Sequence, residues 1–294
     1  MIKYSNMEPK IGFIGQGYIG KNYADDFEKR GYSIVRYALD AEYVDNKDKI
    51  RGCDIVFIAV PTPTTPSGFD DSIVRKVVAL VGKGKIAVIK STLLPGTTKS
   101  IQSEYPEVFV VHSPEFLTEK NAKSDASHPK RNIVGITEMS ESLKSKASEV
   151  IKVLPKAEFE LVCDSSEAEL IKYAGNNLLF LKTVFINVFY DVSEKLGLNW
   201  EVVSQAIGAD SRLGKSHLNP VFGGGRGAGG NCFIKDFSAF ADFASKKLED
   251  KNTEEMLGAI ERKNIDLLVS TGKDIPLLNG VYGKDFIDSY TKSR

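Results

Sequence analysis

Ten residues near the N-terminus predict the fold: Ile11-Gly12-Phe13-Ile14-Gly15-Gln16-Gly17-Tyr18-Ile19-Gly20. The first four are apolar, as in a buried strand, and the glycines then follow the spacing Gly-x-Gly-x-x-Gly before a helical pattern begins. In this strand–turn–helix context, glycines allow a tight turn, the approach of a pyrophosphate and close packing of helix on strand. The stretch predicts a dinucleotide-binding domain, with its cofactor contacts at Gly15, Gly17, Tyr18, Ile19 and Gly20.

Beyond this turn, short apolar runs alternate with helical stretches, as in βαβ units on a parallel sheet. Strands are predicted at residues 10–14, 33–37, 54–60, 86–91, 108–112, 132–136 and 158–162. Helices between them are predicted at residues 18–30, 71–81 and 140–153. The predicted fold class is α/β, with a Rossmann-type parallel-sheet domain over residues 1–163.

An acidic residue about 20 positions beyond the glycines binds the ribose in such domains. Asp40 stands at that distance from Gly20, although the strand alignment also allows Ala38 at the strand tip. We choose Asp40, and hence NAD over NADP. Arg36 keeps a phosphate-bearing cofactor as the alternative.

From Ser165 onward the pattern changes to one long helix. Ser166 and Glu169 have the spacing of a capping box, and apolar residues then recur at helical spacing to about Leu196. Such a helix, of roughly 30 residues, is more than twice the average length, so we expect it to bridge domains or form a dimer interface. With shorter helices at 200–207, 236–247 and 253–270, it predicts an all-helical central domain over residues 164–272.

Composition and charge narrow the functional classes. Lysine plus arginine equals aspartate plus glutamate at 39 each, which gives no net field that favours nucleic acid or a membrane surface. No apolar stretch approaches the roughly 18 residues that span a bilayer, and the N-terminus is polar. The three cysteines and three histidines lack metal-ligand spacing. We therefore expect a cytoplasmic protein with no metal site.

One cysteine stands in a chemically suggestive run, Gly229-Gly230-Asn231-Cys232-Phe233-Ile234-Lys235-Asp236. Most lone cysteines are small buried hydrophobes, but a Gly-Gly-x-Cys turn is a poor place for a core residue. Glycines let the backbone approach a ligand, and a nearby lysine favours a thiolate. Beside a dinucleotide fold, a thiolate is useful when an aldehyde must be held and oxidised again to an acid.

Further polar residues stand where predicted strands end, which is where ligands bind in such folds. Ser91 and Thr92 end one strand, and a segment with Glu115 and Glu119 follows the next. These glutamates are either solvated loop carboxylates or bases for a water attack. On the long helix, Lys172 and Asn176 share a face. They are either a solvated lysine with an incidental asparagine or an oxyanion-stabilising pair.

Taken together, these segments resemble the UDP-glucose/GDP-mannose dehydrogenase family, the nucleotide-sugar 6-dehydrogenases. The similarity runs in order through most of the chain. Its motifs are residues 15–20, Val60-Pro61-Thr62-Pro63-Thr64, Ser91-Thr92 with Pro95-Gly96-Thr97, residues 113–119, residues 129–135, Lys172-x-x-x-Asn176 and residues 229–236.

The resemblance implies a four-electron oxidation of a nucleotide sugar, UDP-glucose being favoured, by two molecules of NAD⁺ in turn. Cys232 would hold the aldehyde as a thiohemiacetal and then as a thioester. Lys172 and Asn176 would stabilise the oxyanions, Asp236 with Thr92 and a water would move protons, and Glu115 would assist hydrolysis of the thioester.

The resemblance also implies binding roles and a dimer. Cofactor contacts would come from Val60, Pro61, Thr62, Ser91, Glu119 and Lys235. Substrate contacts would come from Phe116, Leu117 and Gly229, and from Arg212, which would reach the substrate of a neighbouring subunit in a homodimer.

The chain departs from the family pattern at two places. Residues 222–228 are richer in glycine than usual. Residues 278–284 faintly resemble the first strand and loop of the family's third, UDP-binding domain, with Lys284 as a substrate contact. We expect residues 273–294 to be the start of that domain, and most of the domain to be absent from this chain.

Two other functions stay open on the sequence. Dehydrogenases of the 3-hydroxyisobutyrate or 6-phosphogluconate type have a similar N-terminal domain and a similar lysine–asparagine pair, but no catalytic cysteine. An inactive remnant that binds NAD or a partner is the second alternative.

Overall fold

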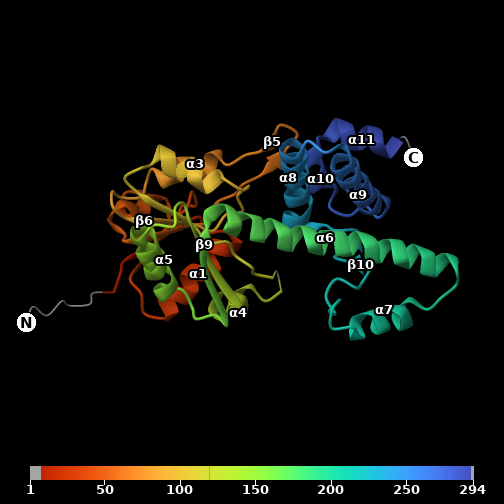
Figure 1. The fold of residues 1–294 in the computed structure, drawn as a ribbon, viewed down its shortest axis with the longest axis horizontal. Helices are drawn as coiled ribbons and strands as arrows, with labels where there is room; N and C mark the ends of the chain where they lie inside the picture. The colour runs from red at the N-terminus through yellow and green to blue at the C-terminus, as the bar shows by residue number, and fades with distance from the viewer. Residues whose placement is uncertain (1–7, 119, 293–294) are drawn as a thin grey trace, which may run out of the picture. The chain divides into compact units, whose positions relative to one another are not determined.

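The computed structural model describes residues 8–118 and 120–292 (Figure 1). The chain forms two compact units. The first comprises Met1–Thr62 and Asp71–Lys172, and the second comprises Pro63–Asp70 and Tyr173–Arg294. The chain passes from one unit to the other within a single long helix, α6 (Ser165–Lys195). The loop Pro63–Asp70 belongs to the second unit, although the residues before and after it in the sequence both belong to the first unit.

The first unit is built on a seven-stranded sheet that confirms each predicted strand. Its strands are β1 (Ile11–Ile14), β2 (Ile34–Tyr37), β3 (Ile55–Ile58), β6 (Ile86–Ile89), β7 (Phe109–His112), β8 (Arg131–Ile136) and β9 (Phe159–Asp164), in the order β2-β1-β3-β6-β7-β8-β9. The first five are parallel. The strand order reverses at β1, so the carboxyl ends of β1 and β3 form the crevice where such sheets bind ligands.

The predicted parallel sheet is confirmed except at one junction. β8 pairs antiparallel with β7 and parallel with β9. The described part of the connection from β7 to β8 contains one short helix, α4 (Ala122–Ser127). A parallel crossover usually runs through a helix that is long enough to span the sheet, whereas the six residues of α4 span only about 9 Å. The chain therefore re-enters the sheet from the carboxyl edge of β7.

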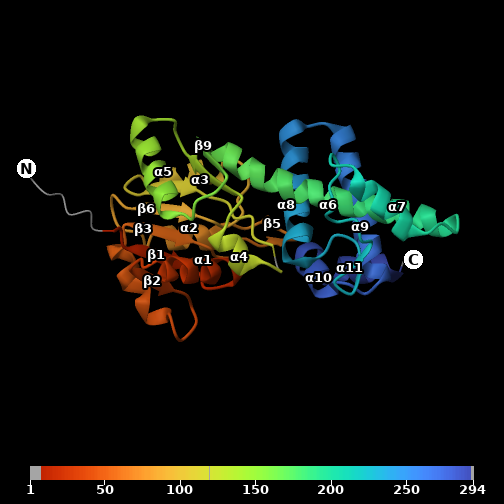
Figure 2. The ribbon, with the colours of Figure 1, turned by 90° about the horizontal axis from the view of Figure 1, so that it is seen from below.

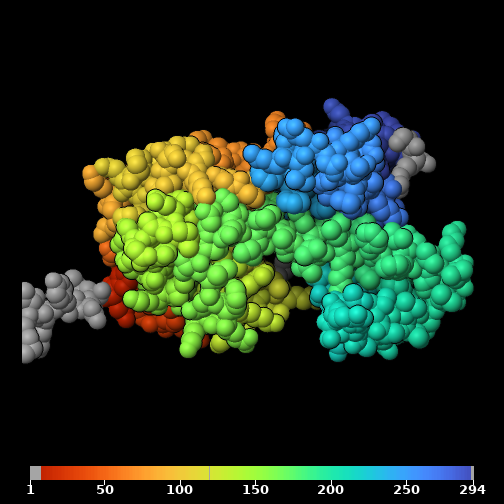
Figure 3. All heavy atoms as spheres, in the orientation of Figure 1, coloured from red at the N-terminus to blue at the C-terminus, as the bar shows by residue number. Residues whose placement is uncertain are grey.

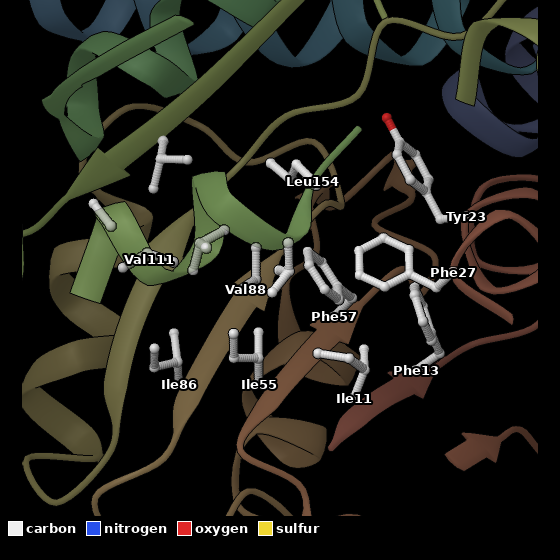
Figure 4. Close-up of a cluster of buried hydrophobic side chains, with 14 of the residues drawn as sticks. Ile11, Phe13, Tyr23, Phe27, Ile55, Phe57, Ile86, Val88, Val111 and Leu154 are labelled. Atoms are coloured by element: carbon white, nitrogen blue, oxygen red, sulfur yellow. The ribbon is translucent and has the colours of Figure 1, made fainter. Parts of the chain in front are cut away.

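Aromatic rings form the centre of the first unit's core. Phe13, Phe27 and Phe57 have ring centroids 5.2–5.3 Å apart, and Figure 4 shows them together beside Ile11 and Ile55. Such ring pairs stabilise a core beyond the area they bury. The helices α1 (Tyr18–Lys29), α4 and α5 (Glu141–Val153) supply further members of this cluster, and the strands β6, β7 and β8 supply others. α2 (Ser72–Val78) contacts β3, and α3 (Thr97–Glu104) contacts β7.

The long helix is confirmed, but its predicted cap is wrong. The Asp164 carboxylate accepts from the Ser166 N–H at 2.9 Å, and the Glu167 carboxylate accepts from the Asp164 N–H at 2.9 Å. This reciprocal pair has the form of a capping box, displaced two residues from the predicted Ser166–Glu169 pair. Glu169 is instead fully buried.

The second unit also contains the helices α7 (Trp200–Ala209), α8 (Gly230–Leu248), α9 (Lys251–Ser270), α10 (Ile275–Tyr282) and α11 (Lys284–Lys292). Figure 2 shows α8, α9, α10 and α11 as neighbours. The rings of Phe180 and Phe237 stack with centroids 4.0 Å apart and join α6 to α8. Two short hairpins complete the unit, β4 (Thr64–Thr65) with β5 (Gly68–Phe69), and β10 (Val221–Phe222) with β11 (Gly225–Arg226).

The unusual glycines of residues 222–228 form the β10–β11 turn. Gly223 and Gly224 have φ values of 62° and 84°, the combination that a type I′ hairpin turn requires and that glycine adopts without strain. Arg226 fixes this hairpin to α6, since its guanidinium donates to Asn187 Oδ1 at 2.8 Å and to Asp191 Oδ1 at 2.6 Å.

The strand expected at residues 278–284 is a helix. Leu278 and Val281 of α10 are buried against Ile234 of α8 and Leu268 of α9. A helix satisfies its backbone groups within the segment, whereas a strand needs a partner. The faint motif resemblance therefore does not predict the local structure of these residues.

Candidate active site

The glycine-rich turn after β1 has the geometry of a dinucleotide cradle. Gly15 has a φ of 91°, and a Cβ there would lie 2.2 Å from the Ala59 carbonyl oxygen. A Cβ on Gly20 would lie 1.9 Å from the Gly15 carbonyl oxygen, whereas one on Gly17 would meet nothing within 4 Å. Gly15 and Gly20 thus close the turn. Gly17, the N-cap of α1, leaves room for a pyrophosphate at a helix N-terminus without a side-chain cap.

The loops that follow β3 and β6 are tied together beside this crevice. The Ser91 hydroxyl donates to the Val60 carbonyl at 2.7 Å and accepts from the Val60 N–H at 3.0 Å. The Thr62 hydroxyl donates to the Thr92 carbonyl at 2.9 Å. The predicted cofactor residues Val60, Thr62 and Ser91 therefore hold the backbone that carries Thr92.

Beyond β2, the residue predicted to bind the ribose lies on an exposed turn. β2 ends at Tyr37, Ala38 follows, and Asp40 is exposed. The Arg36 guanidinium donates to Asp25 Oδ1 at 2.6 Å and to Glu28 Oε2 at 2.9 Å, both on α1. This arginine is already paired with two carboxylates, which leaves it poorly suited to a cofactor phosphate and favours NAD.

The first unit also contains a buried ion pair at the carboxyl end of β7. Lys172 Nζ donates to Glu115 Oε1 at 2.8 Å and to the Glu115 carbonyl at 2.7 Å. The two side chains are only 6% and 7% exposed. Glu115 Oε2 accepts from the Leu117 N–H at 2.7 Å, so both carboxylate oxygens are held. Neither the solvated lysine nor the solvated Glu115 considered from the sequence is correct.

Sequence reasoning missed a second buried lysine in this region. Lys90, 3% exposed, donates to the Ser113 hydroxyl at 3.1 Å and lies 4.5 Å from the Tyr23 ring centroid. Burial lowers the pKa of Lys90 to about 7, despite the opposing effect of the Glu115 carboxylate. The nearby His112 is also buried, and its pKa is lowered to about 3, mainly by desolvation. The sequence feature that could have predicted this buried lysine is its position directly after the apolar run of β6.

Glu169 connects the start of α6 to the loop that follows Thr92. Its carboxylate accepts from the Gly96 N–H at 2.6 Å, the Thr98 N–H at 2.7 Å and the Thr98 hydroxyl at 2.6 Å. These donors belong to the N-terminus of α3, which Glu169 therefore caps from another helix. Burial outweighs these hydrogen bonds and raises the pKa of Glu169 to about 7.

In the second unit, Cys232 lies in the first turn of α8 and is exposed. α8 starts six residues earlier than predicted, so the cysteine belongs to a helix rather than to a loop. The positive end of a helix dipole favours an anion at such a position. The other two cysteines, Cys53 and Cys163, are buried, and burial raises the pKa of each thiol to about 11.

Three polar side chains form a network on α6 and α8 within this unit. Asn176 Nδ2 donates to Asp236 Oδ2 at 2.7 Å, and Lys235 Nζ donates to Asp236 Oδ1 at 2.5 Å. Asp236 is only 1% exposed, and it stands one helical turn beyond Cys232. The network therefore holds a carboxylate on the helical turn after the thiol, with the Asn176 amide of α6 bonded to it.

The remaining predicted residues have simpler surroundings. In the first unit, Arg131 Cζ lies 3.6 Å from the centroid of the Phe116 ring. The Tyr18 hydroxyl donates to the Thr118 carbonyl at 2.6 Å. In the second, Arg212 pairs with Asp210, and Lys284 pairs with Asp288. Leu117 and Ile19 pack against the core, Pro61 is exposed, Gly229 is the N-cap of α8, and Glu119 lies outside the described residues.

Two classes of feature are not found among residues 8–118 and 120–292. No group of three histidine, cysteine or acidic side chains is placed to hold a metal ion. None of the helices in this described part is both long enough and apolar enough to cross a membrane.

Comparison with known proteins identifies relatives of both units. Residues 38–154 match the NAD-binding domain, and residues 166–265 the central domain, of the UDP-glucose/GDP-mannose dehydrogenase family. The chain is 33% identical over 271 residues to the UDP-glucose 6-dehydrogenase of Rickettsia prowazekii, covering 78% of this chain and 61% of that relative. It is 33% identical over 262 residues to a putative UDP-glucose 6-dehydrogenase of Bacillus subtilis, covering 84% and 58%.

A solved structure supports the same assignment. The UDP-glucose dehydrogenase of the archaeon Pyrobaculum islandicum superimposes with a TM-score of 0.76 at 26% identity, over 92% of this chain and 72% of that one. The matches confirm the resemblance predicted from the motifs, the fold class and NAD as the cofactor. The chain spans about three fifths of the length of these two sequence relatives.

Proposed function

Because the chain belongs to the UDP-glucose/GDP-mannose dehydrogenase family, we propose that it oxidises the primary alcohol of a nucleotide sugar to a carboxylate, with UDP-glucose as the favoured substrate. The observation that carries this proposal is Cys232. A thiol exposed on the first turn of a helix, one turn before the buried Asp236 to which Asn176 donates, suits a covalent intermediate. A two-electron dehydrogenase has no use for it.

NAD⁺ would accept the hydride in each of two oxidations. After the first, the Cys232 thiolate adds to the aldehyde carbon, and the carbonyl oxygen becomes a thiohemiacetal oxyanion that takes up a proton. The second oxidation turns this adduct into a thioester. Water then attacks the thioester, the carbon–sulfur bond breaks, and the carboxylate and the thiol are released. The balance is one alcohol, two NAD⁺ and one water to one carboxylate, two NADH and three protons.

The remaining steps are proton transfer, stabilisation of the oxyanions and hydrolysis of the thioester, and different polar residues are proposed for each. Asp236, held by Asn176 and Lys235, is proposed to move the alcohol and water protons with Thr92. Lys172 and Asn176 stand four residues apart on α6 and would stabilise the oxyanions. Glu115, held by Lys172, would assist the hydrolysis. This chemistry needs Cys232 as a thiol, so we propose that the chain acts in the reducing cytoplasm.

Counting NADH per sugar tests the proposal. With UDP-glucose and excess NAD⁺, we expect two NADH for each sugar consumed and UDP-glucuronate as the product. One NADH per molecule of a small hydroxy acid would instead support the 3-hydroxyisobutyrate or 6-phosphogluconate type. No turnover on any nucleotide sugar, with NAD⁺ binding retained, would support the inactive remnant.

We further propose a homodimer through α6. Five apolar side chains, four on its second part and one directly after its end, recur at intervals of seven, four, three and four residues, and each is more than half exposed: Leu178, Phe185, Phe189, Val192 and Leu196. Figure 3 shows that α6 contributes to the outer surface of this unit. Such spacing forms one stripe along a helix, and the stripe can pair with its own copy about a two-fold axis.

Phe185→Glu is expected to convert the dimer to a monomer, because it places a charge in the centre of the stripe. Light scattering behind size exclusion should show the mass fall by half. Lys251→Glu is the matched control, since it introduces the same side chain at an exposed position of α9. A wild-type chain that is monomeric at micromolar concentration would contradict this proposal.

A further inference from the structure

A carboxylate that plays no part in the proposed reaction caps the helix that carries Cys232. Asp274 Oδ2, from the segment before α10, accepts from the Gly230 N–H at 2.7 Å. Gly230 is the first residue of α8 and Cys232 the third. The preceding residue of the same segment, Lys273, donates from Nζ to the Gly227 carbonyl at 3.0 Å. Two adjacent side chains of opposite charge thus hold the two ends of the turn before the thiol.

The fit between this segment and the glycine turn is close enough to constrain both. A Cβ on Gly229 would lie 2.0 Å from Asp274 Oδ2 and 2.7 Å from Lys273 Cε. Asp274 itself adopts a left-handed conformation, with a φ of 55°, which non-glycine residues seldom adopt. Both observations indicate that the position of the Asp274 carboxylate is specified by its surroundings.

The same carboxylate has an electrostatic consequence for the thiol. The N-terminus of a helix favours nearby negative charge, and Asp274 already supplies one anion. A Cys232 thiolate would be a second anion within about one helical turn. Two charges roughly 6 Å apart in water-like surroundings shift a titration midpoint by about half a pH unit.

We infer that Asp274 is a positioning residue for Cys232, which holds the thiol-bearing turn and at the same time restrains formation of the thiolate. This inference rests on the proposed function only in taking Cys232 as a reactive thiol. Other charged or titratable groups near this turn include Lys235 and Asp236 on α8, Lys273 beside Asp274, and His217, whose ring lies 5.8 Å from that of Phe233. They are unchanged in the variants below.

The test is the rate at which iodoacetamide alkylates Cys232, followed by mass spectrometry of its peptide between pH 6 and pH 10. Asp274→Asn keeps an oxygen acceptor for the Gly230 N–H but removes the charge. The midpoint is the pH at which the alkylation rate reaches half its maximum. We expect the midpoint of this variant to lie about half a pH unit below that of the wild type at low salt. The difference from the wild type should shrink in 1 M salt, where the Debye length is about 3 Å.

Asp242→Asn is the matched control, since it removes the same charge from α8 about 18 Å further along the helix. It should leave the midpoint where it is in the wild type. An unchanged or raised midpoint in Asp274→Asn would overturn the inference, even with a lower melting temperature, because a purely structural cap would give that result. The assay uses neither NAD nor a nucleotide sugar, so its outcome is independent of whether the dehydrogenase proposal holds.

Discussion

Replacing Cys232 with serine is expected to abolish formation of the acid, with a fall in turnover of about a thousandfold or more. A serine hydroxyl is a far weaker nucleophile than a thiolate near neutral pH. The first oxidation needs no thiol, so trace turnover should give at most one NADH per sugar. NADH absorbance and chromatography of the sugar nucleotide measure both quantities.

Cys163→Ser is the matched control for this variant. It makes the same substitution at a thiol of the first unit that is only 7% exposed. It should retain the stoichiometry of two NADH per sugar, even if burial of a hydroxyl lowers its stability. A Cys232→Ser enzyme that still produced the acid at the wild-type rate would contradict the proposed covalent mechanism.

The sequence predicted those parts of the fold that local patterns determine. The seven strands alternate with polar turns, so their positions could be read from residue character alone. The reversal of β8 could not, because an apolar run has the same appearance in either direction. The run of residues 278–284 was misassigned for a similar reason: Leu278 and Val281 suit a strand or a helix, and contacts with α8 and α9 decide between them.

In the candidate site, too, the sequence predicted the residues that stand in local motifs and missed those that act over long distances in sequence. Cys232, Lys172 and the glycines of residues 15–20 were predicted because each stands in a motif with characteristic spacing. Glu169 and Asp274 were not, because each acts on a backbone far away in sequence, at Gly96 and Gly230 respectively. A buried carboxylate that caps another helix leaves no spacing signal, and the capping-box pattern assigned Glu169 to the wrong helix.

Replacing Lys172 with methionine is expected to lower the free energy of unfolding by about 3–5 kcal/mol, because Glu115 would be left as a buried charge without its partner. Denaturant unfolding of the isolated chain measures this loss. Lys144→Met is the matched control, since the Lys144–Glu141 pair is exposed. A surface pair of this kind contributes at most about 1 kcal/mol.

The double variant Lys172→Met with Glu115→Gln separates stability from chemistry. The glutamine retains an acceptor for the Leu117 N–H while removing the buried charge, so most of the lost stability should return. Turnover should not return, because the proposed oxyanion stabiliser and the proposed hydrolytic carboxylate are both absent. If the double variant were as active as the wild type, the ion pair would serve only to join α6 to the β7 loop, and the proposed roles of Lys172 and Glu115 in catalysis would be wrong.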